Sequence, residues 1–366
     1  MTITVDLIAA ARPNFMKVAP LYKALDAERK WCRPRLIHTG QHYDANMSDA
    51  FFRDLGLPDS DIHLGVGSGS HAEQTAGVMV AYEKVCVQDR PDWVIVVGDV
   101  NSTLACTLAA TKLGIPVAHL EAGLRSRDRS MPEEINRLAT DALADVLWTP
   151  SLDADENLLR EGVAPARICR VGNIMIDALE MCRDKIEARR FGAEFGLEKG
   201  RYGVVTLHRP SNVDDAGQLS TLVGLLLDAS KSLPLVFPVH PRTRKRLVEF
   251  SLLDRLTNTG AVRLIEPAGY IEFMSLVFSA AAAVTDSGGV QEETTYLGIP
   301  CVTLRDTTER PITVTEGTNR LMKPEELPDA IEQIKKGAWA RGRRPSLWDG
   351  RTAGRVVEDL ERRLSR

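Results

Sequence analysis

Short runs of β-branched and other apolar residues alternate with helix-length segments along the chain, and no other feature restricts its fold as strongly. A near-continuous apolar strand followed by a helix is typical of a parallel sheet that is covered by helices on both faces. We therefore expect an α/β fold built on parallel sheets. The expected strands are Ile3–Ala9, Arg35–Thr39, Trp93–Val97, Val117–Leu120, Val146–Thr149, Tyr202–Leu207, Leu235–Val239, Val262–Ile265, Ala281–Thr285 and Cys301–Leu304.

The chain is too long for one hydrophobic core, and its halves share a pattern. Its 366 residues exceed the roughly 250–300 at which single cores stop growing. A strand, a helix and the sequence Leu-Gly-Ile-Pro follow one another twice, ending at Pro116 and at Pro300. We expect two Rossmann-like domains with a cleft between them, since such sheets bind ligands at the carboxyl ends of their strands. The expected parts are an N-terminal domain at 1–172, a C-terminal domain at 173–350, and a helix at 351–366 that can pack back on the first domain.

Composition and charge exclude several kinds of partner. The net charge of −4 and a pI of about 6.0 argue against nucleic acid or an anionic membrane. No apolar run approaches the ~20 residues of a membrane-spanning helix. The six cysteines are scattered without a Cys-x-x-Cys pair, and no His-x-His or His-Glu-x-x-His spacing occurs. We expect reduced cysteines, a cytoplasmic protein and no metal site.

A Ser-Gly-Gly turn between a strand and a helix predicts a phosphate-binding site. Ser287, Gly288 and Gly289 follow the strand 281–285 and open a helix. Such a turn offers free backbone N–H groups and the positive end of the helix, and its glycines let an anion approach the backbone. Glu293 follows within reach of a ligand's hydroxyl groups. The alternative is an ordinary tight turn.

Three carboxylates lie at strand or helix ends in the first half. Asp99 and Glu121 each follow a strand, and Glu133 opens a helix. Each has a structural alternative: Asp99 can cap a helix, Glu121 can pair with Arg125, and Glu133 can stabilise a helix dipole. The functional hypothesis is that they supply an acid and a base, because carboxylates paired in a closed cleft have pKa values that are pushed apart.

Cations and histidines at similar positions predict an anionic ligand. Arg12 and Lys17 lie around a helix start, where they oppose the helix dipole. His208 and His240 follow two strands of the second half, each near an arginine, and Arg310 follows a third. The alternatives are solvated ion pairs and structural histidines. Together with the Ser-Gly-Gly turn, these residues indicate a phosphorylated ligand, a diphosphate, whose reacting part faces the carboxylates.

One further glycine-rich segment carries no nucleotide fingerprint. Gly65–Ser70 is not Gly-x-Gly-x-x-Gly and does not follow the first strand. We interpret it as a flexible loop and expect no nicotinamide cofactor.

The chain as a whole resembles the non-hydrolysing UDP-N-acetylglucosamine 2-epimerases. Any one matching motif is modest, but their order along the chain is specific. The matches are Arg12-Pro-x-x-x-Lys17, Gln41-His42, Gly98-Asp99, Glu121-Ala-Gly-Leu-Arg125, Pro132-Glu-Glu-x-Asn-Arg137, Gly172-Asn173, His208-Arg209, Pro238-Val-His240, Asp286-Ser-Gly-Gly-Val-Gln-Glu-Glu293 and Arg305-Asp-Thr-Thr-Glu-Arg310.

The resemblance implies a GT-B-like fold, similar to that of two-domain glycosyltransferases, with UDP on the second domain. It places Glu293 at the ribose and Phe273 near the uracil. The implied catalytic residues are Asp99, Glu121, Glu133, His208 and His240. The implied substrate-binding residues are Arg12, Lys17, Phe273, Ser287, Gly288, Gly289, Glu293 and Arg310.

The family reaction is the reversible conversion of UDP-N-acetylglucosamine to UDP-N-acetylmannosamine, which feeds cell-surface polysaccharide synthesis. UDP leaves C1 while the C2 proton is removed, and UDP then adds back to the 2-acetamidoglucal intermediate as the other face of C2 is protonated. The resemblance also implies a homodimer that needs no cofactor. The alternatives are a hydrolysing epimerase, a GT-B glycosyltransferase that uses a UDP-sugar, and an inert UDP-sugar-binding protein.

The chain departs from the family pattern at a few positions. Ala10-Ala11 precede Arg12 where the family usually has glycine, and Asn14 stands where glutamate is frequent. Asp44 replaces part of the allosteric site of some bacterial members, and no arginine of that site lies near 67–71. We therefore expect activation by a second substrate molecule to be altered or absent.

Overall fold

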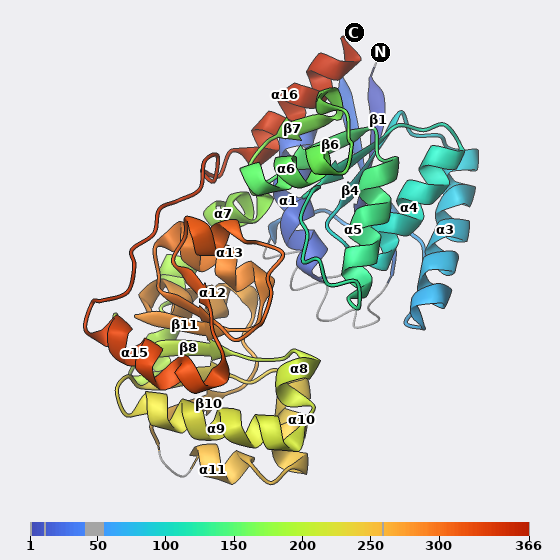
Figure 1. The fold of residues 1–366 in the computed structure, drawn as a ribbon. Helices are drawn as coiled ribbons and strands as arrows, with labels where there is room; N and C mark the ends of the chain where they lie inside the picture. The colour runs from blue at the N-terminus through green and yellow to red at the C-terminus, as the bar shows by residue number, and fades with distance from the viewer. Residues whose placement is uncertain (1, 11, 41–54, 258–259, 366) are drawn as a thin grey trace. The chain divides into compact units, whose positions relative to one another are not determined.

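The computed structural model describes residues 2–10, 12–40, 55–257 and 260–365. It divides into two compact units, the first formed by Met1–Met181 and Ser346–Arg366 and the second by Cys182–Pro345 (Figure 1). Gln41, His42 and Asp44 lie outside the described residues. Within the described part of the chain, no helix is long and apolar enough to cross a membrane.

The first unit is a parallel sheet of seven strands in the order β3-β2-β1-β4-β5-β6-β7. Helices α3 and α4 lie side by side in this unit (Figure 1). Its strands are β1 (Ile3–Ala9), β2 (Cys32–His38), β3 (Ile62–His63), β4 (Trp93–Val97), β5 (Val117–Leu120), β6 (Val146–Thr149) and β7 (Ile168–Arg170). Its helices are α1 (Arg12–Ala27), α3 (His71–Gln88), α4 (Asn101–Lys112), α5 (Pro132–Leu143), α6 (Leu152–Arg160), the start of α7 (Ile174–Arg189) and α16 (Thr352–Leu364).

The second unit repeats this topology with six parallel strands in the order β10-β9-β8-β11-β12-β13. Its strands are β8 (Gly203–Thr206), β9 (Leu235–Pro238), β10 (Val262–Ile265), β11 (Ala282–Thr285), β12 (Cys301–Thr303) and β13 (Asn319–Leu321). Its helices are α8 (Pro210–Val213), α9 (Ala216–Ser230), α10 (Pro241–Glu249), α11 (Leu253–Thr257), α12 (Tyr270–Ser279), α13 (Gly288–Leu297), α14 (Ile312–Thr315) and α15 (Leu327–Lys335).

In both sheets the strand order reverses beside the first strand. β1 pairs with β2 on one side and β4 on the other, and β8 pairs in the same way with β9 and β11. The loops after these strands diverge at such a point, which leaves room for a ligand at the carboxyl end of the sheet. Each sheet thus has one switch point, the place where its strand order reverses. This point locates the candidate site of the unit.

The α/β fold and the expected strands are confirmed, with ends that differ by a few residues. Three strands were not predicted: β3, β7 and β13. Each has only two or three residues and lies at the edge of its sheet. Such a strand is buried on few sides, so it needs no apolar run that a sequence pattern would show.

The chain passes between the two units twice. The division falls inside α7, between Met181 and Cys182, and again before Ser346, whereas the sequence suggested boundaries at 172/173 and 350/351. Helix α16 packs on α1. Asp359 of α16 accepts a 2.8 Å hydrogen bond from the indole of Trp148, and Trp348 donates at 3.0 Å to the carbonyl of Pro150.

Candidate active site

Lys17 and Glu121 form a buried ion pair at the switch point of the first sheet. Lys17 comes from α1 and Glu121 from the end of β5, and they are 8% and 4% exposed. Asn14 donates a 2.9 Å hydrogen bond to the carbonyl of Val97. A Cβ on Gly98, whose φ is +71°, would lie 3.2 Å from Lys17 Nζ and 3.5 Å from Glu121 Oε2. Glycine therefore leaves space for the ion pair.

Glu121 has two features that packing alone does not require. Its φ is +71°, a conformation that non-glycine residues rarely adopt and that concentrates at functional sites. Its Oε2 contacts Lys17, whereas its buried Oε1 has no hydrogen-bond partner among the described residues. A buried acceptor without a partner is costly. One carboxylate oxygen is thus held in place, and the other keeps an acceptor that no described residue uses.

The structural alternative for Glu121, a pair with Arg125, does not occur. Arg125 instead binds Asp141 at 2.7 Å and forms a bidentate pair with Glu161 at 2.9 and 2.7 Å. The sequence also suggested that Lys17 binds substrate, and its described contact is with Glu121.

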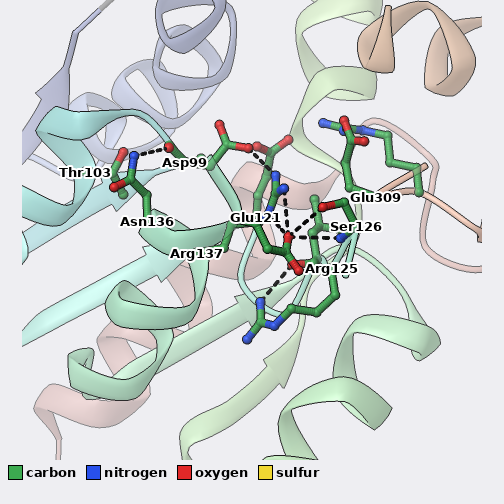
Figure 2. Close-up of polar contacts among 12 residues, drawn as sticks. Asp99, Thr103, Glu121, Arg125, Ser126, Asn136, Arg137 and Glu309 are labelled. Atoms are coloured by element: carbon green, nitrogen blue, oxygen red, sulfur yellow. Dashed lines mark hydrogen bonds and ion pairs between the residues drawn. The ribbon is translucent and has the colours of Figure 1, made fainter. Parts of the chain in front are cut away.

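Asp99 follows β4, the strand that pairs with β5, and so lies near the loop of Glu121 (Figure 2). Side chains of α5 hold it in place. Its carboxylate pairs with Arg137, and its carbonyl accepts a 2.9 Å hydrogen bond from Asn136. Helix α4 begins after Val100 with no side-chain cap, so Asp99 does not serve as the helix cap. The Asp99 side chain is 30% exposed, which leaves it accessible to a ligand.

The two acids that open α5 have different roles. Glu134 is buried and accepts hydrogen bonds from the N–H groups of Ser126 and Arg127 at 3.0 and 2.9 Å. Burial alone would raise the pKa of Glu134, but these N–H groups and Arg137 lower it below its usual value. Glu133 is half-buried and makes no hydrogen bond or ion pair with the other described residues. Among the described residues, Glu133 is therefore the acid of this pair without a structural partner.

A buried network that the sequence did not reveal joins the two carboxylate loops. His119 of β5 hydrogen-bonds the carbonyl of Gly98 through Nε2 at 2.8 Å and Asp141 through Nδ1 at 2.6 Å. Asp141 also accepts from the N–H of Gly123 at 3.0 Å. Burial would raise the pKa of Asp141, but His119 and Arg125 lower it below its usual value. This ionised centre fixes the loop after β4 against the loop after β5.

In the second unit, Ser287 and Gly288 begin α13 directly after β11. Ser287 is the N-cap residue, yet its side chain makes no capping hydrogen bond; its N–H donates to Thr285 Oγ1 at 2.9 Å. A Cβ on Gly288 would lie 2.8 Å from both Arg310 Nη1 and Glu309 Oε1. The structure thus brings the predicted phosphate-binding turn, Arg310 and Glu309 together.

Asp286 organises the histidine side of this switch point. It is fully buried and accepts hydrogen bonds from the N–H groups of His208 and Arg209, both at 2.9 Å, and from the His208 ring at 2.8 Å. Burial would raise the pKa of Asp286, but His208 lowers it. The ring centroids of His208 and His240 are 5.5 Å apart. Burial and the neighbouring His208 lower the pKa of His240, which favours its neutral form.

Glu293 and Phe273 lie on the neighbouring elements α13 and α12. Glu293 is buried and accepts a 2.9 Å hydrogen bond from Tyr270 of α12. Burial, with a smaller contribution from the neighbouring Glu292, raises the pKa of Glu293 to about 8 despite this bond. Phe273 is partly buried beside Val290. Glu293 is thus a neutral carboxylic acid over much of the neutral pH range.

Replacing Glu293 with glutamine should raise the melting temperature at pH 8 by at least about 3 °C, equivalent to roughly 1 kcal/mol. The unfolded chain titrates this group at 4.5 and the folded protein at about 8. The folded protein therefore binds the proton more tightly, and its stability falls as the pH rises through that window. The gain should be several-fold smaller at pH 5.

Differential scanning fluorimetry at both pH values would measure this effect. Glu332→Gln is the control, because its carboxyl on α15 has a lowered pKa. An equal shift for Glu293→Gln at pH 5 and pH 8 would show that Glu293 does not titrate in this range.

Two doubly wound parallel sheets of matching strand order, one with carboxylates at its strand ends and the other with a Ser-Gly-Gly helix start, are the architecture of a GT-B-like α/β fold. The model of the UDP-N-acetylglucosamine 2-epimerase family matches residues 23–361. The chain belongs to this family.

Several relatives support the assignment. The UDP-N-acetylglucosamine 2-epimerase of Methanocaldococcus jannaschii is 42% identical over 366 residues, which cover 97% of this chain and 98% of the relative. The UDP-2,3-diacetamido-2,3-dideoxy-D-glucuronate 2-epimerase of Pseudomonas aeruginosa is 41% identical over 319 residues, 86% of this chain and 87% of the relative. The crystal structure of the M. jannaschii enzyme with UDP-GlcNAc and UDP superposes with a TM-score of 0.88 at 41% identity, covering 98% of this chain and 99% of that one.

Proposed function

We propose that the protein epimerises C2 of UDP-N-acetylglucosamine, in both directions, by elimination and re-addition of UDP. The observation that carries this proposal is the Glu121 carboxylate, which is held by Lys17 through one oxygen and has its other oxygen buried without a partner. A base in this state is fixed in position and ready to accept a proton. The M. jannaschii relative, named for this reaction and solved with UDP-GlcNAc and UDP, supports the substrate.

The proposed chemistry needs a base, an acid and stabilisation of a leaving diphosphate. A carboxylate of the first unit removes the C2 proton, the C1–O bond to UDP breaks, and its electrons leave with UDP while a C1=C2 double bond forms. In the return step an acid protonates the opposite face of C2 and a UDP oxygen bonds C1. Asp99, Glu121 and Glu133 are the proposed acid and base groups, and Ser287 to Gly289 with Arg310 hold the diphosphate.

If C2 is deprotonated, product formed in heavy water should carry deuterium at C2. A proton NMR time course with UDP-N-acetylglucosamine would show the C2 signal disappear as UDP-N-acetylmannosamine accumulates, without added NAD. Product that keeps its C2 proton would contradict elimination. Free N-acetylmannosamine with UDP would instead indicate the hydrolysing reaction, and transfer of sugar to an acceptor would indicate a glycosyltransferase.

A second candidate substrate has similar support. The P. aeruginosa relative acts, by its name, on a UDP-2,3-diacetamido-2,3-dideoxy-D-glucuronate, and its identity of 41% nearly equals that of the M. jannaschii relative. The C2 chemistry is the same for both sugars. The same deuterium experiment with each nucleotide sugar, compared by kcat/KM, would identify the preferred one.

We also propose a cytoplasmic homodimer. All six cysteines are free, and five of them are buried, as in a reducing compartment. Val80 and Val87 lie seven residues apart on α3 and are exposed, which suits contact with a second copy. Light scattering that gives a monomer mass would refute the dimer.

A further inference from the structure

Glu309 is an anion enclosed by three arginines beside the start of α13. It is 5% exposed. Its Oε1 lies 2.6 Å from Arg310 Nη1 and 3.9 Å from Arg209 Nη2, and its Oε2 lies 2.9 Å from Arg305 Nη2. Burial would raise the pKa of Glu309, but Arg310 and Arg305 hold it far below its usual value. Glu309 is therefore ionised at neutral pH.

This carboxylate lies where an anionic ligand would be most strongly stabilised. Its Oε1 would be 2.8 Å from a Cβ on Gly288, so it lies against the first turn of α13. Arginines and a helix start are the groups that bind phosphates in proteins. Glu309 and a diphosphate on this turn would compete for the same guanidinium N–H groups.

A second acid and an unused donor belong to the arginine cluster. Glu292 pairs with Arg310 at 2.8 Å, in addition to the contacts of Glu309. Arg305 Nη1 is buried and has no hydrogen-bond partner among the described residues. A second anion, in addition to Glu309, would therefore be stabilised here.

We propose that Glu309 is a resident counter-ion that competes with the ligand's diphosphate for Arg209 and Arg310, so that the site rejects a single phosphate group. The inference rests on the proposed placement of UDP at Ser287 to Gly289. A ligand with two phosphate groups supplies enough charge to take over the arginines from one carboxylate, whereas inorganic phosphate does not.

Removing the charge of Glu309 should tighten ligand binding. In the ligand-free variant the buried arginines lose their main counter-ion, which is unfavourable, and a bound phosphate restores it. We expect Glu309→Gln to lower the Kd of UDP by about tenfold. It should also give measurable binding of inorganic phosphate, which the wild type should lack.

Isothermal titration calorimetry with UDP and with inorganic phosphate tests this directly. Glu332→Gln is the matched control, since it removes the charge of an ion-paired glutamate on α15, which pairs with Lys336. It should leave both affinities unchanged. Glu309→Asp keeps the charge on a shorter side chain and should tighten UDP binding less, which keeps the test decisive if Glu309→Gln does not fold.

Weaker UDP binding by Glu309→Gln and by Glu309→Asp would overturn the proposal and make Glu309 a residue that only positions Arg310. If the wild type binds UDP but does not exchange the C2 proton, the proposed epimerase function is refuted. The UDP affinities of the Glu309 variants still test the present inference. If the wild type does not bind UDP at all, this inference is overturned with the phosphate-binding site.

Discussion

Replacing Glu121 with glutamine should lower kcat by about 10³-fold, within the 10²–10⁴ range of general acid–base catalysis. Glutamine has nearly the same shape but cannot accept the C2 proton, and it leaves Lys17 without its counter-ion. Asp99→Asn and Glu133→Gln should cost a similar factor if they supply the remaining proton transfers. The Kd of UDP should change little, because the proposed UDP-binding residues belong to the second unit.

Steady-state kinetics and UDP titrations on the same preparations would separate the two effects. Glu156→Gln is the control in the first unit, since Glu156 lies on the exposed side of α6 and forms a loose 3.8 Å pair with Arg160. Its kcat should match that of the wild type. Unchanged kcat in Glu121→Gln would remove Glu121 from the chemistry.

Replacing Gly288 with alanine should weaken UDP binding by about thirtyfold, corresponding to roughly 2 kcal/mol. The added methyl group would lie 2.8 Å from Arg310 Nη1 and Glu309 Oε1, so both side chains must move. It would also block the close approach of a phosphate to the backbone. Because the loss affects binding, KM should rise more than kcat falls.

Gly354→Ala provides the comparison for this substitution. Gly354 lies in α16, and a Cβ there meets nothing within 4 Å. Alanine should be neutral or slightly stabilising at this position, because glycine is the poorer helix former. Equal UDP affinity in both alanine variants would show that the turn before α13 does not hold the diphosphate.

The strand-end loops could be predicted from sequence because each follows a buried apolar run. Asp99, Glu121 and Ser287 stand directly after such runs, and parallel strands place their carboxyl ends at one edge. Local pattern therefore located the loops that carry the candidate residues within each unit, including the helix start at Gly288.

The partners of these side chains could not be predicted in the same way. Glu121 pairs with Lys17, 104 residues away in the chain, rather than with the nearby Arg125. Around Glu309, Arg305 and Arg310 stand close by in the sequence, but Arg209 is a hundred positions upstream and its contact could not be predicted. Such contacts depend on which strands become neighbours and on how the helices pack, and no short motif contains that information.

The double passage of the chain between the units determines the order in which they become complete during synthesis. The second unit is one continuous stretch, Cys182–Pro345, whereas the first needs residues from both ends of the chain. Translation therefore supplies the whole second unit before it supplies α16. Until then the indole of Trp148 lacks Asp359, and α1 lacks the helix that packs on it. The unit that is begun first is the last to have all of its core.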